Sequence, residues 1–585
     1  MGRVTQTTTD AAVLHPASPV DAPWWHDAVI YQIYPRSWAD SDGDGVGDLP
    51  GITARLPYLR ELGVDAIWLS PFYVSPMHDA GYDVADYRNI DPVFGSLGDA
   101  DTLIATAHDL GIKVIVDLVP NHSSSEHEWF RAALAAAPGS PERGRYMFRE
   151  GKGEDGSEPP NNWPSVFGGA GWTRVVEADG TPGQWYLHLF DTTQPDYDWT
   201  NPEVGDEFVS ILSFWCDRGV DGFRVDVANA LVKEEGLPDF DGPLQAFDAT
   251  DHNPEAALPP AHGEEADQPR APMWDQEGVH EIYRRWRATL EAMPGPERIL
   301  CAEAWVKPGS RLARYVREDE MHQAFNFDFL DTHWDATQLH DVIEASYRDN
   351  DAVGAPTTWV LSNHDVVRHA SRLGLDQSLP RPNGIAADQP QPDAELGLRR
   401  ARAATMLMLG LPGSAYIYQG EELGLPESTD MPDEFRQDPT FARTRGKETG
   451  RDGCRVPMPW VRDAPSLGFG PGDGTWLPQP ESYGRLAVDQ QEGVAGSTLE
   501  LYRSMLAARR VDRLGLGSAS WHELSDDDVV AFVNASPDGS RRTLVLVNLG
   551  TEAVELPEGA TVTHQSEELT GDGRVPTDVA VWARI

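Results

Sequence analysis

The stretch Gly222-Phe223-Arg224-Val225-Asp226-Val227 is a short apolar run that carries two charged side chains. In an extended strand, alternate side chains lie on the same face, so Arg224 and Asp226 are expected to share one face and the apolar side chains the other. A guanidinium would then lie beside a carboxylate at the end of a buried strand. A surface strand with one charged face has the same pattern, so the rest of the chain must decide between the two interpretations.

Seven further apolar runs alternate with amphipathic helical stretches from about Trp24 onward. Eight buried parallel strands with helices between them predict a (β/α)8 TIM barrel, in which functional side chains lie at the carboxyl ends of the strands. Polar residues cluster at those ends, at 117–122, Asp226, Glu303 and 364–365. The predicted strands are 28–34, 66–70, 114–119, 222–227, 299–305, 324–330, 358–362 and 414–418.

Interruptions of this rhythm indicate the other domains. A Gly-, Pro- and Trp-rich stretch after the third strand is too long for an ordinary connection and predicts a small inserted domain. Alternating β-branched residues after about Leu514 predict a C-terminal antiparallel β domain. The predicted parts are a disordered tail at 1–23, the barrel at 24–122 and 194–513, the inserted domain at 123–193 and the C-terminal domain at 514–585. Within the barrel we expect two more polar insertions after the inserted domain, the second polar insertion at about 233–272 and the third polar insertion at about 426–483.

Composition narrows the class of partner. The 585-residue chain has 94 acidic and 47 basic residues, a formal net charge of −47, which argues against binding to nucleic acid or to an anionic membrane surface. A neutral sugar would be indifferent to this charge. Its three cysteines form neither a disulfide framework nor a metal-binding pattern, and no signal peptide or membrane span is visible, so we expect a cytoplasmic protein. The sequence leaves the oligomeric state open.

The stretch 40–48 has carboxylates at alternate positions with glycines between them, a spacing that lets a loop wrap around a hard cation. Its first half is similar to an EF-hand loop, but position twelve is Gly51 and a strand precedes the loop, so we reject an EF-hand. Without a cation the carboxylates would repel one another, which favours a structural divalent metal, Ca²⁺ before Mg²⁺, over a solvated turn. The predicted ligands are the side chains of Asp40, Asp42, Asp44 and Asp48 and the backbone carbonyl of Val46.

Two carboxylates at the strand ends suit glycoside hydrolysis, which needs an acid near the leaving oxygen and, for retention, a nucleophile about 5 Å away. Asp226 and Glu303 lie near the ends of the fourth and fifth strands, which are neighbours in a barrel. We expect Arg224 to keep Asp226 ionised, and the apolar neighbours of Glu303 to help that group hold its proton.

Four motifs in this chain resemble, in order, the signature regions of the α-amylase family, glycoside hydrolase family 13. They are DLVPNH at 117–122, GFRVD at 222–226, AEAW at 302–305 and SNHD at 362–365. QPDYDW at 194–199 resembles the motif QPDLNW of the α-glucosidase and oligo-1,6-glucosidase branch, with Tyr197 and Asp198 as departures. The metal loop and the stretch 451–460 resemble the same branch, and the match covers nearly the whole chain beyond the tail.

The resemblance implies a role for each matching residue. Asp226 would be the nucleophile, Glu303 the general acid and base, and Asp365 a third carboxylate that binds the sugar hydroxyls and steadies the transition state. Phe167 and Phe190 are candidate stacking platforms for the sugar, although they could equally be the core of the insertion. His122 and His364 would also contact the sugar, and Arg224 would orient the nucleophile. Asp79 and Tyr82 would close the pocket at the non-reducing end of the substrate. Arg455, in preference to Arg451, would help them.

The function so implied is a retaining, exo-acting α-glucosidase that releases glucose from short α-glucosides without an organic cofactor. A transglucosidase, or an isomerase of sucrose or maltose, would use the same chemistry and stays open, while a non-catalytic barrel that only binds is the remote alternative. In the resembling branch a valine after the nucleophile, here Val227, favours α-1,6 bonds. Maltose nevertheless stays open as the best substrate.

Overall fold

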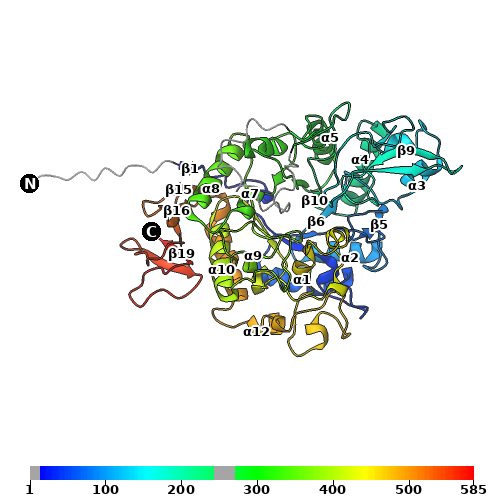
Figure 1. Ribbon diagram of the computed structural model, residues 1–585. Helices are drawn as coiled ribbons and strands as arrows, with labels where there is room; N and C mark the ends of the chain where they lie inside the picture. The colour runs from blue at the N-terminus through cyan, green and yellow to red at the C-terminus, as the bar shows by residue number, and fades with distance from the viewer. Residues whose placement is uncertain (1–12, 243–269) are drawn as a thin grey trace, which may run out of the picture.

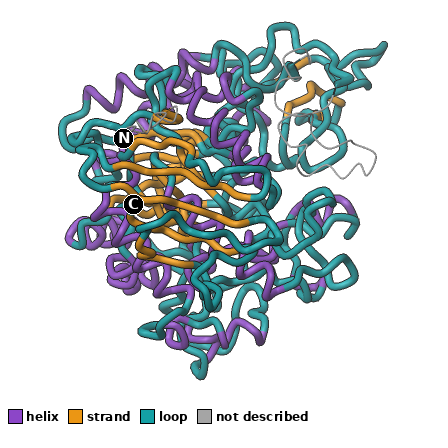
Figure 2. Tube along the Cα trace, turned by 90° about the vertical axis from the view of Figure 1, so that its left-hand side faces the viewer, coloured by secondary structure: helices purple, strands orange, loops and turns teal. Residues whose placement is uncertain are grey.

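The computed structural model describes residues 13–242 and 270–585. Eight parallel strands run side by side through the middle of the molecule with helices around them (Figure 2). A parallel bridge between Phe325 and Thr358 joins the two end strands and confirms the predicted barrel. In sheet order the strands are β12 (Gln323–Ala324), β11 (Ile299–Ala302), β10 (Gly222–Val225), β6 (Lys113–Leu118), β3 (Ala66–Leu69), β2 (Val29–Ile33), β14 (Ser414–Tyr418) and β13 (Thr358–Val360).

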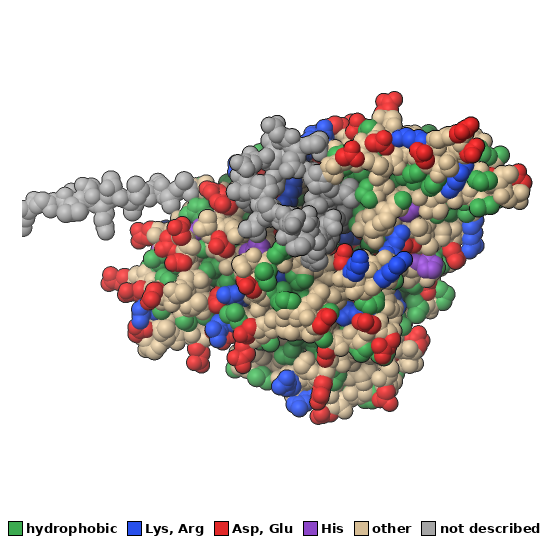
Figure 3. Space-filling model, in the orientation of Figure 1, with side chains coloured by type: hydrophobic (Ala, Val, Ile, Leu, Met, Phe, Trp, Pro, Cys, Tyr) green, Lys and Arg blue, Asp and Glu red, His purple; other side chains and the backbone are tan. Residues whose placement is uncertain are grey.

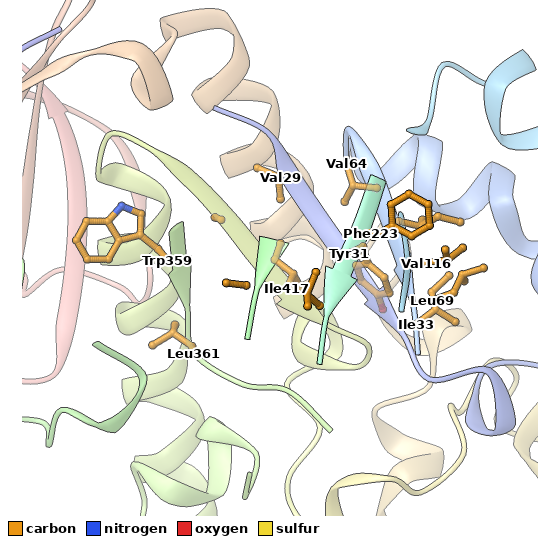
Figure 4. Packing of buried hydrophobic residues seen from close by; sticks show 14 of the residues in the cluster. Val29, Tyr31, Ile33, Val64, Leu69, Val116, Phe223, Trp359, Leu361 and Ile417 are labelled. Atoms are coloured by element: carbon orange, nitrogen blue, oxygen red, sulfur yellow. The ribbon is translucent and has the colours of Figure 1, made fainter. Parts of the chain in front are cut away.

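Alternate side chains of these strands enter two different cores. Val116 and Phe223 belong to the large core formed with the surrounding helices (Figure 4), whereas Ile115 and Ile299 pack in a separate core inside the barrel. This alternation places Arg224 on the inner face, as the period of two predicts. The helices that follow the strands include α1 (Leu49–Leu62), α2 (Leu97–Asp109), α4 (Pro202–Asp217), α5 (Val279–Ala292), α8 (Ala336–Asp351), α10 (Ala394–Gly410) and α13 (Thr498–Asp512).

The predicted sixth strand, 324–330, is mostly wrong. Strand β12 ends at Ala324, and the short helix α7 (Phe327–Asp331) takes up the rest. The cause is Asn326, whose side chain accepts a hydrogen bond from the backbone N–H of Phe329 at 3.0 Å and so caps the helix. An apolar run of this length fits either a strand or a buried helix.

The chain between β6 and α4 forms the small inserted domain. It carries α3 (Glu128–Ala135) and a three-stranded antiparallel sheet of β7 (Phe148–Arg149), β9 (Pro182–Leu187) and β8 (Trp172–Val176). In Figure 1 this sheet lies at the opposite side of the molecule from the C-terminal sheet. The barrel rim therefore has an added wall on the side of β6.

The C-terminal antiparallel sheet contains β15 (Ser518–Trp521), β16 (Val529–Ala535), β17 (Arg542–Asn548), β19 (Val579–Arg584) and β18 (Thr561–Gln565). Its first edge is β1 (Val13–His15), which pairs antiparallel with β15 (Figure 1). The expectation of a disordered tail is therefore wrong for 13–23, because β1 satisfies the backbone groups of an edge that would otherwise be open. Residues 1–12 of that tail, and 243–269 of the second polar insertion, lie outside the described residues.

Acidic side chains are spread widely over the face seen in Figure 3, with basic ones between them. Within 13–242 and 270–585, none of the helices has the length and apolar character needed to span a membrane.

Glu421 is a buried carboxyl at the end of the barrel. It begins the 3-10 helix η6 (Glu421–Leu423) after β14 and is 3% exposed. Its pKa is raised to about 8, mainly by burial and also by neighbouring Glu422, while the backbone N–H of Tyr418 and the charges of Arg368 and Arg372 act in the opposite direction. In the unfolded chain a glutamate titrates near pH 4.3, roughly, so the folded protein holds a proton that the unfolded chain has lost.

The free energy of unfolding should therefore fall as the pH rises from about 5 to 8, because in that window the folded protein still holds the Glu421 proton that the unfolded chain has released. We predict that Glu421→Gln, which is neutral throughout, shows a smaller decrease in Tm between pH 5 and 8 than the wild type. Exposed Glu344→Gln is the matched control. A wild-type pH slope in Glu421→Gln would contradict the prediction.

Candidate active site

The inner face of β10 brings three carboxylates to one guanidinium. Arg224 is 1% exposed, and its Nη1 lies 2.5 Å from Oδ1 of Asp226 and 3.1 Å from Oδ1 of Asp117. Its Nη2 lies 3.4 Å from Oε2 of Glu303. The side chains predicted as nucleophile and acid thus contact the two terminal nitrogens of the same guanidinium. Two carboxylates brought together at one site are the groups that glycoside hydrolysis uses.

Backbone hydrogen bonds fix these carboxylates just beyond the strands. Asp226 N–H donates to the carbonyl of Leu118 at 2.8 Å, and Glu303 N–H donates to the carbonyl of Val225 at 3.0 Å. Val227 then adopts a left-handed backbone with φ 41°, and its N–H donates to Oε2 of Glu303 at 2.6 Å. The turn after β10 therefore orients the carboxylate of the neighbouring strand.

The charges in this cluster are not balanced. Burial raises the pKa of Asp226 and of Glu303, and Arg224 lowers both. Burial also raises the pKa of Asp117, to about 6. The expectation that Arg224 keeps Asp226 ionised does not match the direction of this pKa, because desolvation outweighs the ion pair. Asp226 makes the shorter contact with Arg224, whereas Glu303 also accepts hydrogen bonds from Val227 N–H and the Trp305 indole, so each anion has its own partners and the groups titrate together.

A cavity of about 380 Å³ lies against these carboxylates. Its wall brings together catalytic and sugar-binding residues that were predicted from the sequence, and they come from the inserted domain, the barrel and the third polar insertion. Arg224, His364 and Arg455 are not part of the wall. The wall also includes Trp305, Asp331 and Glu448. The indole N–H of Trp305 donates to Oε1 of Glu303 at 3.1 Å. The predicted residues in the wall are Asp79, Tyr82, His122, Phe167, Phe190, Asp226, Glu303, Asp365 and Arg451.

Arg451 closes one end of this cavity. Its Nη2 lies 3.0 Å from Oδ1 of Asp79, and its Nη1 lies 3.0 Å from Oδ1 of Asp365. The preference for Arg455 as the partner of Asp79 is therefore wrong. Arg455 lies deeper, where its Nη2 donates to Asp365 at 2.9 Å and its Nε donates to the carbonyl of His364 at 2.8 Å.

Asp365 and His364 have opposite preferences for a proton. Burial by itself would raise the pKa of Asp365, but neighbouring His364 and the two arginines hold it below its usual range. Burial lowers the pKa of His364 well below its usual value, so the ring is neutral. Gln32 donates to Nδ1 of His364 at 2.7 Å, which assigns the ring proton to Nε2, 2.6 Å from the hydroxyl of Tyr82.

The predicted aromatic platforms both face the cavity. The Phe190 ring centre is 5.0 Å from the ring centre of His122, and the Arg451 guanidinium is 5.6 Å from the ring centre of Phe167. Both rings also belong to an apolar cluster with Trp274. Their position suits contact with a ligand as well as packing of the insertion.

Two residues at this site were not singled out from the sequence. Gln194 donates to Oδ2 of Asp79 at 3.0 Å and lies 3.2 Å from Nε2 of His122, whose pKa burial lowers to about 4. Lys233 is buried, with its ammonium 2.8 Å from Asp196 and 2.7 Å from Oδ1 of Asn121. Gln194 stands in the QPDYDW motif and could have been found there. Lys233 begins a polar insertion and carries no such signal.

Lys233 therefore joins the segment after β10 to the barrel rim and to the inserted domain. Removing one partner from a buried ion pair typically costs about 3–5 kcal/mol because the other charge is left unpaired. We predict that Lys233→Met lowers the free energy of unfolding by roughly that amount, measured by urea denaturation. The double variant Lys233→Met/Asp196→Asn should recover part of the loss, and a double variant less stable than the single one would contradict this.

The predicted metal loop has a partly suitable geometry. Single carboxylate oxygens of Asp40, Asp42 and Asp48 lie within 4.8 Å of one another, a donor set of hard oxygens that suits Ca²⁺ or Mg²⁺. Asp44 is not part of this group, and its Oδ1 accepts the backbone N–H of Val46 at 2.8 Å. The structure thus gathers three of the four predicted carboxylates.

Comparison with known proteins places this site among carbohydrate-active enzymes. Residues 32–515 match the family described as alpha amylase, catalytic domain. The chain is 36% identical to a probable alpha-glucosidase of Rhizobium meliloti (strain 1021), over 95% of this chain and 94% of that protein. It is 33% identical to an oligo-1,6-glucosidase of Parageobacillus thermoglucosidasius, over 93% and 94%. The crystal structure of an alpha-glucosyl transfer enzyme, XgtA, matches with a TM-score of 0.80 and 36% identity, over 96% of this chain and 99% of that one.

Proposed function

The chain belongs to the α-amylase family, and from that membership and the geometry of the site we propose a retaining, exo-acting α-glucosidase that acts on short α-glucosides. The observation that carries the proposal is the shared guanidinium, which holds Asp226 and Glu303 a short distance apart beside one cavity. Two such carboxylates are the groups that double displacement requires.

In the proposed reaction, Asp226 attacks the anomeric carbon while Glu303 protonates the departing oxygen. A glucosyl ester forms on Asp226, and the bond to the leaving group breaks. Glu303, now a carboxylate, takes a proton from water, and the resulting attack releases α-glucose and regenerates Asp226. Asp365 stays ionised beside two arginines, so it can accept hydrogen bonds from sugar hydroxyls and oppose the positive charge of the transition state.

Exo action is supported by the closed end of the cavity. Arg451, Asp79 and Gln194 are joined by hydrogen bonds there, and His122 lies next to Gln194. A single terminal glucose can be bounded by these groups, and the rest of the wall, which includes Trp305 and Asp331, is then available to the leaving group. This wall supports a substrate that enters with its non-reducing end first.

A second candidate is glucosyl transfer, in which a sugar hydroxyl replaces water in the second step. It is favoured by the similarity to the alpha-glucosyl transfer enzyme XgtA. Hydrolysis of maltose, isomaltose and sucrose side by side, with product analysis at high substrate concentration, separates the two reactions. The same assay tests the linkage, for which Val227 favours α-1,6 bonds.

Asp226→Asn is the test of the chemistry. The amide cannot form the ester, so we expect at least about 10⁴-fold loss of kcat on maltose or isomaltose. Because Asn keeps the size of the side chain, Tm should change little, and this serves as the folding control. Near-wild-type hydrolysis by the variant would refute the mechanism.

We further propose that the 40–48 loop binds Ca²⁺, with Mg²⁺ as the alternative, through Asp40, Asp42 and Asp48. The ion would offset the repulsion between these carboxylates and act on stability rather than on the reaction. A cytoplasmic location is supported by the three buried, unpaired cysteines.

Chelation should therefore lower Tm by several degrees, and added Ca²⁺ should restore it. In Asp42→Asn the restoration should be weaker at the same Ca²⁺ concentration, while kcat should be unchanged because Asp42 is not part of the cavity wall. Identical melting of the wild type with and without chelator would remove support for the metal.

A further inference from the structure

The third polar insertion meets the inserted domain beside the closed end of the cavity. Helix α11 (Pro439–Thr444) of this insertion contributes Thr440 and Thr444 to the cavity wall. From the same helix, Arg443 reaches the inserted domain, where its Nη1 lies 3.4 Å from Oδ1 of Asp191 and 3.2 Å from Oγ of Ser165. Arg443 thereby links two segments that are about 250 residues apart in sequence.

From Asp191 the contacts continue to Asp79. The backbone N–H of Asp191 donates to Oε1 of Gln194 at 2.9 Å, which fixes the orientation of the Gln194 amide. The Gln194 Nε2 then donates to Oδ2 of Asp79 at 3.0 Å. Since Asp191 also accepts hydrogen bonds from the backbone and the hydroxyl of Thr193, at 2.9 and 2.7 Å, the geometry of this turn is well determined.

The other oxygen of Asp79 is held from the same helix by a second route. Asp438 caps α11 by accepting the N–H of Thr440 at 2.8 Å, and it accepts a bond from Nε of Arg451 at 2.6 Å. Arg451 in turn contacts Oδ1 of Asp79 at 3.0 Å. Both carboxylate oxygens of Asp79 are therefore oriented by contacts that begin at the two ends of α11.

We propose that Arg443 is a positioning residue for the terminal glucose. It ties α11 to the turn at Asp191, so that Gln194 and Arg451 hold Asp79 from both sides. This inference rests on the proposed function, because Asp79 lies at the end of the cavity that takes the glucose. Arg443 itself is outside the cavity wall and acts through Asp191.

A loss of this tie should weaken glucose binding without changing the chemistry at Asp226 and Glu303. Arg443→Met keeps much of the aliphatic length and removes the charge. We expect KM to rise on the order of tenfold with kcat within about twofold. The rise should be equal for maltose, isomaltose and 4-nitrophenyl α-glucoside, because these substrates share the terminal glucose and differ only in the leaving group.

Two further variants sharpen the test. Arg443→Lys retains a charge for Asp191 and should recover part of the wild-type KM. The exposed Arg462, in the same insertion, provides the matched control, and Arg462→Met should behave as wild type. A merely structural role for Arg443 would lower kcat through loss of folded enzyme and leave KM unchanged, and this outcome would overturn the proposal.

Binding of D-glucose provides a readout that does not depend on turnover. We expect glucose to raise the Tm of the wild type and of Arg462→Met, and to raise that of Arg443→Met much less at the same concentration. The role of Arg443 is refuted if the wild type releases glucose from maltose or isomaltose while Arg443→Met shows both the wild-type KM and the wild-type increase in Tm with glucose. If the wild type itself releases no glucose from any α-glucoside, the proposed function fails instead.

Discussion

One buried guanidinium facing three carboxylates is the constraint on which the site depends. Arg224 contacts Asp117, Asp226 and Glu303, so a single positive charge must offset three acidic groups in a desolvated space. Burial makes full ionisation of all three unfavourable, so the coupled group retains a proton that its carboxylates share. The same imbalance thus supplies the proton that the departing oxygen needs.

The barrel makes this arrangement possible because it places side chains from neighbouring strands on one inner face in register. Arg224 pairs directly with Asp117 on β6 and with Cys301 on β11. Two residues further along the chain, the same alternation places Asp226 and Glu303 on this inner face. The backbone bonds between the strand ends then leave little freedom for either carboxylate. Catalytic geometry here follows from strand register, whereas the insertions add residues to the part of the wall that can contact the ligand.

The sequence was sufficient for the features that follow from local periodicity and failed for those set by distant contacts. The shared face of Arg224 and Asp226 follows from the period of two. The choice between Arg451 and Arg455 could not be predicted from the sequence, because it depends on a contact with Asp438 that holds Arg451 against Asp79. Lys233 is buried only because Asn121 and Asp196 arrive from two other segments. The pairing of β1 with β15 likewise joins residues about 500 apart in the chain.

Asp79 belongs to the barrel, but its orientation is set by residues from other segments of the chain. Asp79 follows β3 in the chain, yet its two oxygens are oriented by Gln194 of the QPDYDW segment and by Arg451 of the third insertion. A carboxylate held from two sides loses the rotational freedom that it would otherwise give up on binding a sugar, so less free energy is lost when the glucose docks. The cavity wall also contains residues outside this set, among them Asp331 and Glu448. Changes there can alter which linkage or acceptor is used while the recognition of the terminal glucose stays the same.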